Sequence, residues 1–122
     1  MAQSIDPILL EKPEKRYQEF LKTVARRGEV WTLASEMGYT TMEADNKVML
    51  VVFPTEKHAN LFSEGDFTEP SEHDDFLARC REFAADSDFG FMVFPNGKDA
   101  YMAETIPLLR DLQDAIHKAK KK

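Results

Sequence analysis

The sequence predicts an α+β fold in which a small, mostly antiparallel sheet, a meander plus a later strand, packs against three main helices and one short helix. Apolar side chains recur with a helical period in residues 13–27, and β-branched and aromatic side chains favour a strand in residues 29–33. Residues 48–53 form an unbroken apolar run, which is typical of a central strand buried on both faces.

The first helix is expected at residues 13–27. Pro13 suits the first turn, where its missing N–H costs nothing. Arg26 and Arg27 complement the helix dipole in the last turn, and Gly28 supplies the left-handed residue that commonly ends a helix. The apolar stripe of this helix consists of Tyr17, Phe20, Leu21, Val24 and Ala25.

Three strands are expected next, at residues 29–33, 39–42 and 48–53, joined by turns into an antiparallel meander. Pro54 stops the third strand because it lacks a donor for the sheet. Thr55 is expected to cap the short helix that follows.

A polar loop is expected at residues 63–69, followed by a second long helix. Ser71 stands three residues before Asp74, a spacing that resembles a capping box. A later strand is expected at residues 89–94, and Thr105 is expected to cap the last helix. The apolar stripe of the second long helix consists of Phe76, Leu77, Cys80, Phe83 and Ala84.

The length favours a single domain over residues 1–122, with an N-terminal extension at 1–12 and a basic C-terminal tail at 118–122. The 16 Lys and Arg against 22 Asp and Glu give a net charge of −6, which argues against a nucleic-acid partner. One cysteine indicates a reducing compartment. Without a leader pattern or a long apolar run, we expect a cytoplasmic protein that does not associate with membranes.

The residues that usually carry catalysis form no recognisable pattern. The five glycines are dispersed, no serine has the spacing of a nucleophile motif, and the three histidines have no partner at metal-ligand spacing. Cys80 shares a helical stripe with apolar residues, which favours the core over a reactive thiol. We therefore predict no catalytic residue, no metal and no cofactor, and the sequence leans against an enzyme.

The strongest electrostatic feature is an acidic stretch at residues 64–75 that contains no basic residue. Its acids can simply stabilise a helix N-terminus, or they can dock a protein partner with a basic surface. The residues proposed for docking are Glu69, Glu72, Asp74 and Asp75.

A second hypothesis is a ligand pocket between the first helix and the sheet. Its residues would be Arg16, Tyr17, Glu29 and Trp31, since Arg and Glu beside aromatic walls can hold a polar ligand. An ordinary structural Arg–Glu pair beside a core tryptophan is the alternative. An exposed sheet edge could also pair two copies into a homodimer.

Short motifs follow one another along the chain in the order Arg16-Tyr17, Phe20-Leu21, Glu29 to Leu33, Phe53-Pro54, Phe76-Leu77 and Val93-Phe94-Pro95. This ordered set resembles a bacterial family known only as a domain of unknown function, number twenty-seven fifty. The resemblance implies a small bacterial cytosolic α+β protein and brings no established activity. Together with the acidic surface, it favours a noncatalytic protein-interaction, accessory or toxin-neutralising module over the small-molecule-binding protein or enzyme.

Overall fold

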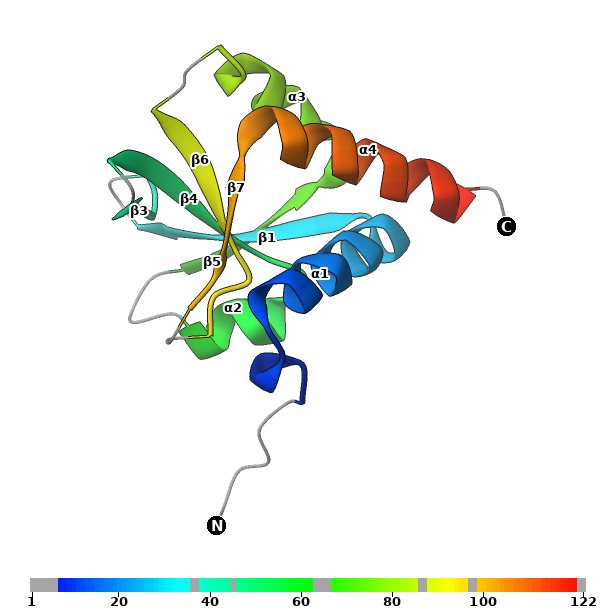
Figure 1. Cartoon of the computed structure of the whole chain (residues 1–122), viewed down its shortest axis with the longest axis horizontal. Helices are drawn as coiled ribbons and strands as arrows, with labels where there is room; N and C mark the ends of the chain where they lie inside the picture. The colour runs from blue at the N-terminus through cyan, green and yellow to red at the C-terminus, as the bar shows by residue number, and fades with distance from the viewer. Residues whose placement is uncertain are drawn as a thin grey trace.

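The computed structural model describes residues 7–35, 38–44, 46–62, 67–85, 88–96 and 99–120 (Figure 1). The helices are the 3-10 turn η1 (Pro7–Leu10), α1 (Pro13–Arg27), α2 (Glu56–Phe62), α3 (His73–Phe83) and α4 (Thr105–Lys120). The strands are β1 (Glu29–Ser35), β2 (Gly38–Tyr39), β3 (Thr41–Ala44), β4 (Lys47–Phe53), β5 (Phe67–Glu72), β6 (Phe89–Val93) and β7 (Tyr101–Glu104).

Within the described residues, these strands form one seven-stranded sheet. β1 pairs with β5, β2 and β4, all antiparallel, and β3 pairs antiparallel with β4. β6 runs parallel to β4, and β7 closes the other edge antiparallel to β6. The predicted α+β fold with a mostly antiparallel sheet is confirmed.

Helices cover the two faces of the sheet unequally. Tyr17 of α1 stacks on Tyr101 of β7 with ring centroids 4.0 Å apart, and α3 contacts the same face through Phe76 and Phe91. α4 runs beside α1 on this face (Figure 1). The short α2 lies against the opposite face, where its Phe62 contacts Phe53 of β4. Three helices therefore bury one face, and one short helix covers part of the other.

The helix α1 has the predicted bounds, because its signals are local. Pro13 occupies the first turn, and Gly28 caps the C-terminus with φ 83°, donating its N–H to the carbonyl of Val24. Phe20 and Val24 on the apolar stripe are fully buried. The cap of α2 is also as predicted, since Thr55 Oγ1 accepts a hydrogen bond from the backbone N–H of His58 at 3.2 Å.

The prediction for residues 63–69 is wrong at its C-terminal end, because β5 begins at Phe67. Residues 63–66 lie outside the described part of the chain. β5 pairs with β1 over six residue positions, and this long-range partner supplies the hydrogen bonds that make the polar segment a strand. Ser71 consequently belongs to β5, and Glu72 occupies the N-cap of α3 without a side-chain cap bond.

Two further boundaries differ from the sequence prediction. The strand expected at residues 39–42 is divided into β2 and β3. β2 pairs with β1 and β3 pairs with β4, and Thr40 lies between them. Thr105 is the first residue of α4, and its hydroxyl donates to the carbonyl of Phe89 at 3.4 Å. This bond joins the start of α4 to β6.

Candidate functional site

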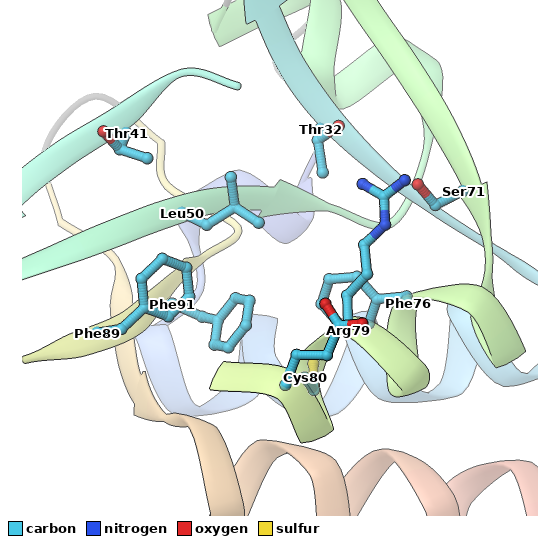
Figure 2. Close-up of a pocket in the computed structure, with 10 residues that line it drawn as sticks. Thr32, Thr41, Leu50, Ser71, Phe76, Arg79, Cys80, Phe89 and Phe91 are labelled. Carbon is cyan, nitrogen blue, oxygen red and sulfur yellow. The ribbon is translucent and has the colours of Figure 1, made fainter. Parts of the chain in front are cut away.

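A pocket of about 410 Å³ lies between α3 and the helix-covered face of the sheet (Figure 2). Its residues come from β1, β3, β4, β5, α3 and β6. They are Thr32, Thr41, Leu50, Ser71, Phe76, Arg79, Cys80, Glu82, Phe89 and Phe91. A volume of this size lies within the range of about 300–1,000 Å³ that is usual for small-molecule sites.

The pocket lies beneath α3, where β1 and β4 cease to pair with each other. β1 and β4 pair directly at Thr32 and Val52, whereas nearer the N-terminal end of β4 the partner is β3, with Thr41 opposite Leu50. Thr32 and Thr41 both line the pocket at this divergence. Short side chains at these positions leave space that a larger apolar residue would fill.

The floor of the pocket is aromatic. Phe91 is 1% exposed and makes edge contacts with Phe76 at 5.5 Å and with Phe89 at 5.4 Å, measured between ring centroids. Leu50 and Cys80 are also buried. These walls favour the apolar part of a ligand, since burying apolar surface is worth about 25 cal/mol per Å².

The rim of the pocket is polar. Arg79 and Glu82 are exposed on α3, and Ser71 is half-buried on β5. Figure 2 shows the Arg79 guanidinium directed toward the side of the pocket where Thr32 and Ser71 lie. The Thr32 hydroxyl donates to the carbonyl of Glu69 at 3.3 Å. An apolar floor beneath a rim with a guanidinium is the arrangement that holds an amphipathic ligand by both ends.

Cys80 lines this pocket without being activated. Burial raises the pKa of its thiol from the ordinary 9.0 to about 12, although the nearby Arg81 charge opposes the shift. The thiol is therefore protonated at neutral pH, and a protonated thiol is a poor nucleophile. The placement of Cys80 among the core side chains agrees with its position on the apolar stripe.

The buried thiol predicts a loss of stability at high pH. The unfolded chain releases the thiol proton above about pH 9, whereas the folded protein keeps it up to about pH 12, so the free energy of unfolding falls between these values. The limiting slope is about 1.4 kcal/mol per pH unit. Urea unfolding at pH 8 and 10.5 measures it. In Cys80→Ala the fall should be smaller, and an equal fall in both proteins would contradict the prediction.

The structure places Arg16 in a buried corner. Its side chain is fully buried, with Nε donating to the carbonyl of Phe94 at 3.0 Å and Nη1 to the carbonyl of Glu11 at 2.6 Å. Nη2 donates both to the carbonyl of Asp99 at 2.9 Å and to its carboxylate at 2.5 Å. These bonds tie α1 to the segment after β6.

The other three residues predicted for a pocket between the first helix and the sheet lie on α1 and β1. Tyr17 is buried, and its hydroxyl donates to Asp111 Oδ2 at 2.7 Å. Glu29 and Trp31 are half-buried on β1, where Trp31 lies opposite Phe53, a residue of the face that α2 covers. The structure does not bring the four side chains together, and none of them lines the pocket beneath α3.

The four acidic docking residues lie on one edge of the molecule. Glu69 and Glu72 are exposed on β5, and Asp74 and Asp75 are exposed in the first turn of α3. β5 has β1 as its sheet partner and contains Pro70. Charges and proline on an edge strand discourage pairing with other chains. Docking of a basic partner, and homodimer formation, stay predictions.

Sequence reasoning missed the pocket. The helix supplies three lining residues within five positions, Phe76, Arg79 and Cys80, but the opposing wall comes from strands that are distant in sequence. The signal that the sequence offered for this pocket was a pair of short polar side chains, Thr32 and Thr41, in segments predicted to form strands. Among the described residues, no three His, Cys, Asp or Glu side chains form a metal cluster, and no helix is long and apolar enough to cross a membrane.

The fold and the pocket define a class: a small α+β protein with a ligand-sized cavity between one helix and its sheet. The chain belongs to the DUF2750 family, described as a protein of unknown function, whose model matches residues 17–112. No curated protein and no solved structure matches it significantly. The matched region contains every residue of the pocket.

Proposed function

We propose that this protein binds a small molecule with an apolar body and a carboxylate end in the pocket beneath α3. The observation that carries the proposal is a cavity of about 410 Å³ that joins an aromatic floor to a rim bearing Arg79. Phe76, Phe89 and Phe91 would enclose the body of the ligand. The guanidinium would take the carboxylate, since its planar donors match two carboxylate oxygens.

The chemistry of the lining supports binding more than catalysis. The Cys80 thiol is held protonated by its raised pKa, and none of the described residues that line the cavity is a histidine. The hydroxyls of Ser71 and Thr41 lie at the rim, where they can orient a polar group. The pocket therefore favours the small-molecule hypothesis, in a different place from the one expected between the first helix and the sheet.

Two charged rim residues allow a test with opposite expected signs. Arg79→Met should weaken binding of a bicyclic aromatic carboxylate such as naphthoate about tenfold, which corresponds to about 1.4 kcal/mol. Glu82→Gln should strengthen it, because a carboxylate on the same rim repels the ligand. Isothermal titration calorimetry of the full chain measures both, with thermal unfolding as a check on folding.

The uncharged ligand naphthamide is the matched control. It shares the ring system, so both variants should bind it as the unsubstituted protein does. Naphthoate affinities that are equal in Arg79→Met and Glu82→Gln would remove the carboxylate from the proposal. Absence of binding by any aromatic or medium-chain aliphatic carboxylate would overturn the proposed function.

A further inference from the structure

A groove of about 660 Å³ lies between α1 and α4, and it shares none of its described lining residues with the pocket beneath α3. The two helices run in the same direction (Figure 1). At one end of the groove the Tyr17 hydroxyl donates to Asp111, and at the other end Arg26 and Lys118 line the two sides. The groove therefore has a direction, from the N-terminal to the C-terminal parts of both helices.

Charge changes sign along this groove. Asp111 lines its N-terminal end, where Glu14 is exposed in the first turn of α1. Lys22, Arg26 and Lys118 are exposed along its C-terminal part. Basic residues near a helix C-terminus complement the helix dipole, so two helices that run in the same direction gather these charges at one end. The groove is therefore acidic at one end and basic at the other.

A two-fold axis that lies in the contact plane and crosses both helices at a right angle makes this surface complementary to itself. Such an axis sets α1 and α4 antiparallel to the same helices of a second copy, so each acidic end faces a basic end. The axis must pass midway between the charges that it brings together. Between Glu14 and Arg26 the midpoint is residue 20, and between Asp111 and Lys118 it falls between residues 114 and 115.

The two midpoints lie at nearly the same height, which a single axis requires. The hydrogen bond of 2.7 Å between Tyr17 and Asp111 places residue 17 of α1 close to the level of residue 111 of α4. The midpoint lies three residues further along α1 and between three and four further along α4, a difference smaller than the rise of one residue, about 1.5 Å. One axis can therefore oppose Glu14 to Arg26 of the second copy, and Asp111 to its Lys118, at the same time.

The floor of the groove adds apolar contact to these charges. Leu21 is buried there, and Ala25, Ala115 and Ala119 are half-buried. Small side chains let the helices of two copies approach closely, and the aliphatic stem of Lys22 can cover apolar surface while its charge stays in water. The groove therefore offers hydrophobic burial at its centre and charge pairs toward its ends, which is the usual anatomy of a specific interface.

We propose that two copies of this chain associate through the α1–α4 groove, with their helices antiparallel about this two-fold axis. The charges favour a second copy because both signs lie on one surface, in the register that one axis needs. Among the described residues, Glu14 and Arg26 form no ion pair, so both are available to a second copy. Lys118 pairs with Asp114 of its own helix at 3.1 Å, but an exposed pair of this kind contributes little and does not exclude another partner. The association does not depend on the small-molecule proposal.

Sedimentation equilibrium of the full chain measures the Kd of the dimer. Arg26→Glu sets two glutamates against each other at both ends of the interface, so Kd should rise about tenfold or more. Glu14→Arg sets two arginines against each other and should have the same effect. The double variant Glu14→Arg/Arg26→Glu exchanges the two charges and should recover the original Kd within about threefold, because opposite charges face each other again.

Arg81→Glu is the matched control, since it makes the same change of charge at an exposed position on α3. Its Kd should equal that of the unsubstituted protein. A chain that stays monomeric up to about 1 mM would overturn the proposal. So would a double variant that dimerises as weakly as the single variants. Unchanged dimerisation in both single variants would assign the association to another surface, such as a sheet edge, and would also overturn it.

Discussion

Replacing Arg16 with methionine is expected to lower the free energy of unfolding by about 2–4 kcal/mol, because the buried guanidinium makes several hydrogen bonds and one to a charged group is worth about 1.5–3 kcal/mol. The methionine keeps most of the apolar stem but removes every donor. The carbonyls of Phe94, Glu11 and Asp99 each lose a hydrogen bond. The Phe94 carbonyl is buried, and a buried acceptor without a partner costs about 1–3 kcal/mol, whereas the Glu11 and Asp99 carbonyls are partly exposed and can bond to water.

The backbone at Phe94 makes this corner more sensitive. Phe94 has φ 52°, a left-handed conformation that bulky residues rarely adopt and that costs about 1–3 kcal/mol. Its N–H donates to the carbonyl of Val52 at 2.8 Å, and its own carbonyl accepts from Arg16. Two bonds therefore hold the residue in an unfavourable conformation. Removing Arg16 leaves one of them.

Chemical denaturation measures the effect, and neighbouring variants provide the comparison. Arg16→Lys keeps the charge but loses the planar set of donors, so we expect an intermediate loss. Lys15→Met is the control, because Lys15 is exposed and pairs with Glu11 at 3.8 Å. It should change stability by less than about 0.5 kcal/mol. A loss of similar size in Arg16→Met and Lys15→Met would contradict the structural role of Arg16.

The structural role of Arg16 also shows what the sequence could predict. The helix that carries it was predicted with the correct bounds because a proline, an apolar stripe and a glycine are all local signals. The partners of the guanidinium lie as far as Asp99, 83 positions along the chain, and no periodicity reports them. The same residue could therefore be placed on its helix, but not in its hydrogen-bond network.

The strands show the same distinction. β4 was predicted from its apolar run, whereas β5 is polar and owes its conformation to β1, which lies more than thirty residues earlier. The pocket lies beyond local prediction for a related reason. Thr32 and Arg79 meet in one cavity because β1 diverges from β4 where α3 passes over it. This space is a property of the topology.

Phe91→Ala is expected to produce the second large effect, a loss of about 3–5 kcal/mol in the free energy of unfolding. Phe91 is 1% exposed and contacts both Phe76 and Phe89, so its removal takes away the centre of the aromatic floor. Because the side chain already borders the pocket, the new void joins the existing cavity of about 410 Å³. The variant is therefore expected to be destabilised and, at the same time, to accept larger apolar ligands.

A loss of stability together with a gain in ligand capacity distinguishes a residue that lines the pocket from an ordinary core residue. Phe53→Ala should cost a similar amount, since Phe53 is fully buried, but it lies against α2 on the other face. A bicyclic compound such as naphthalene is larger than the single-ring void at position 53, whereas it can enter the enlarged cavity at position 91. At a free concentration a hundredfold above Kd, it should restore about 2.7 kcal/mol to Phe91→Ala. Urea unfolding with and without naphthalene measures the gain, and equal gains in the two variants would show that the pocket beneath α3 has no special capacity for ligands.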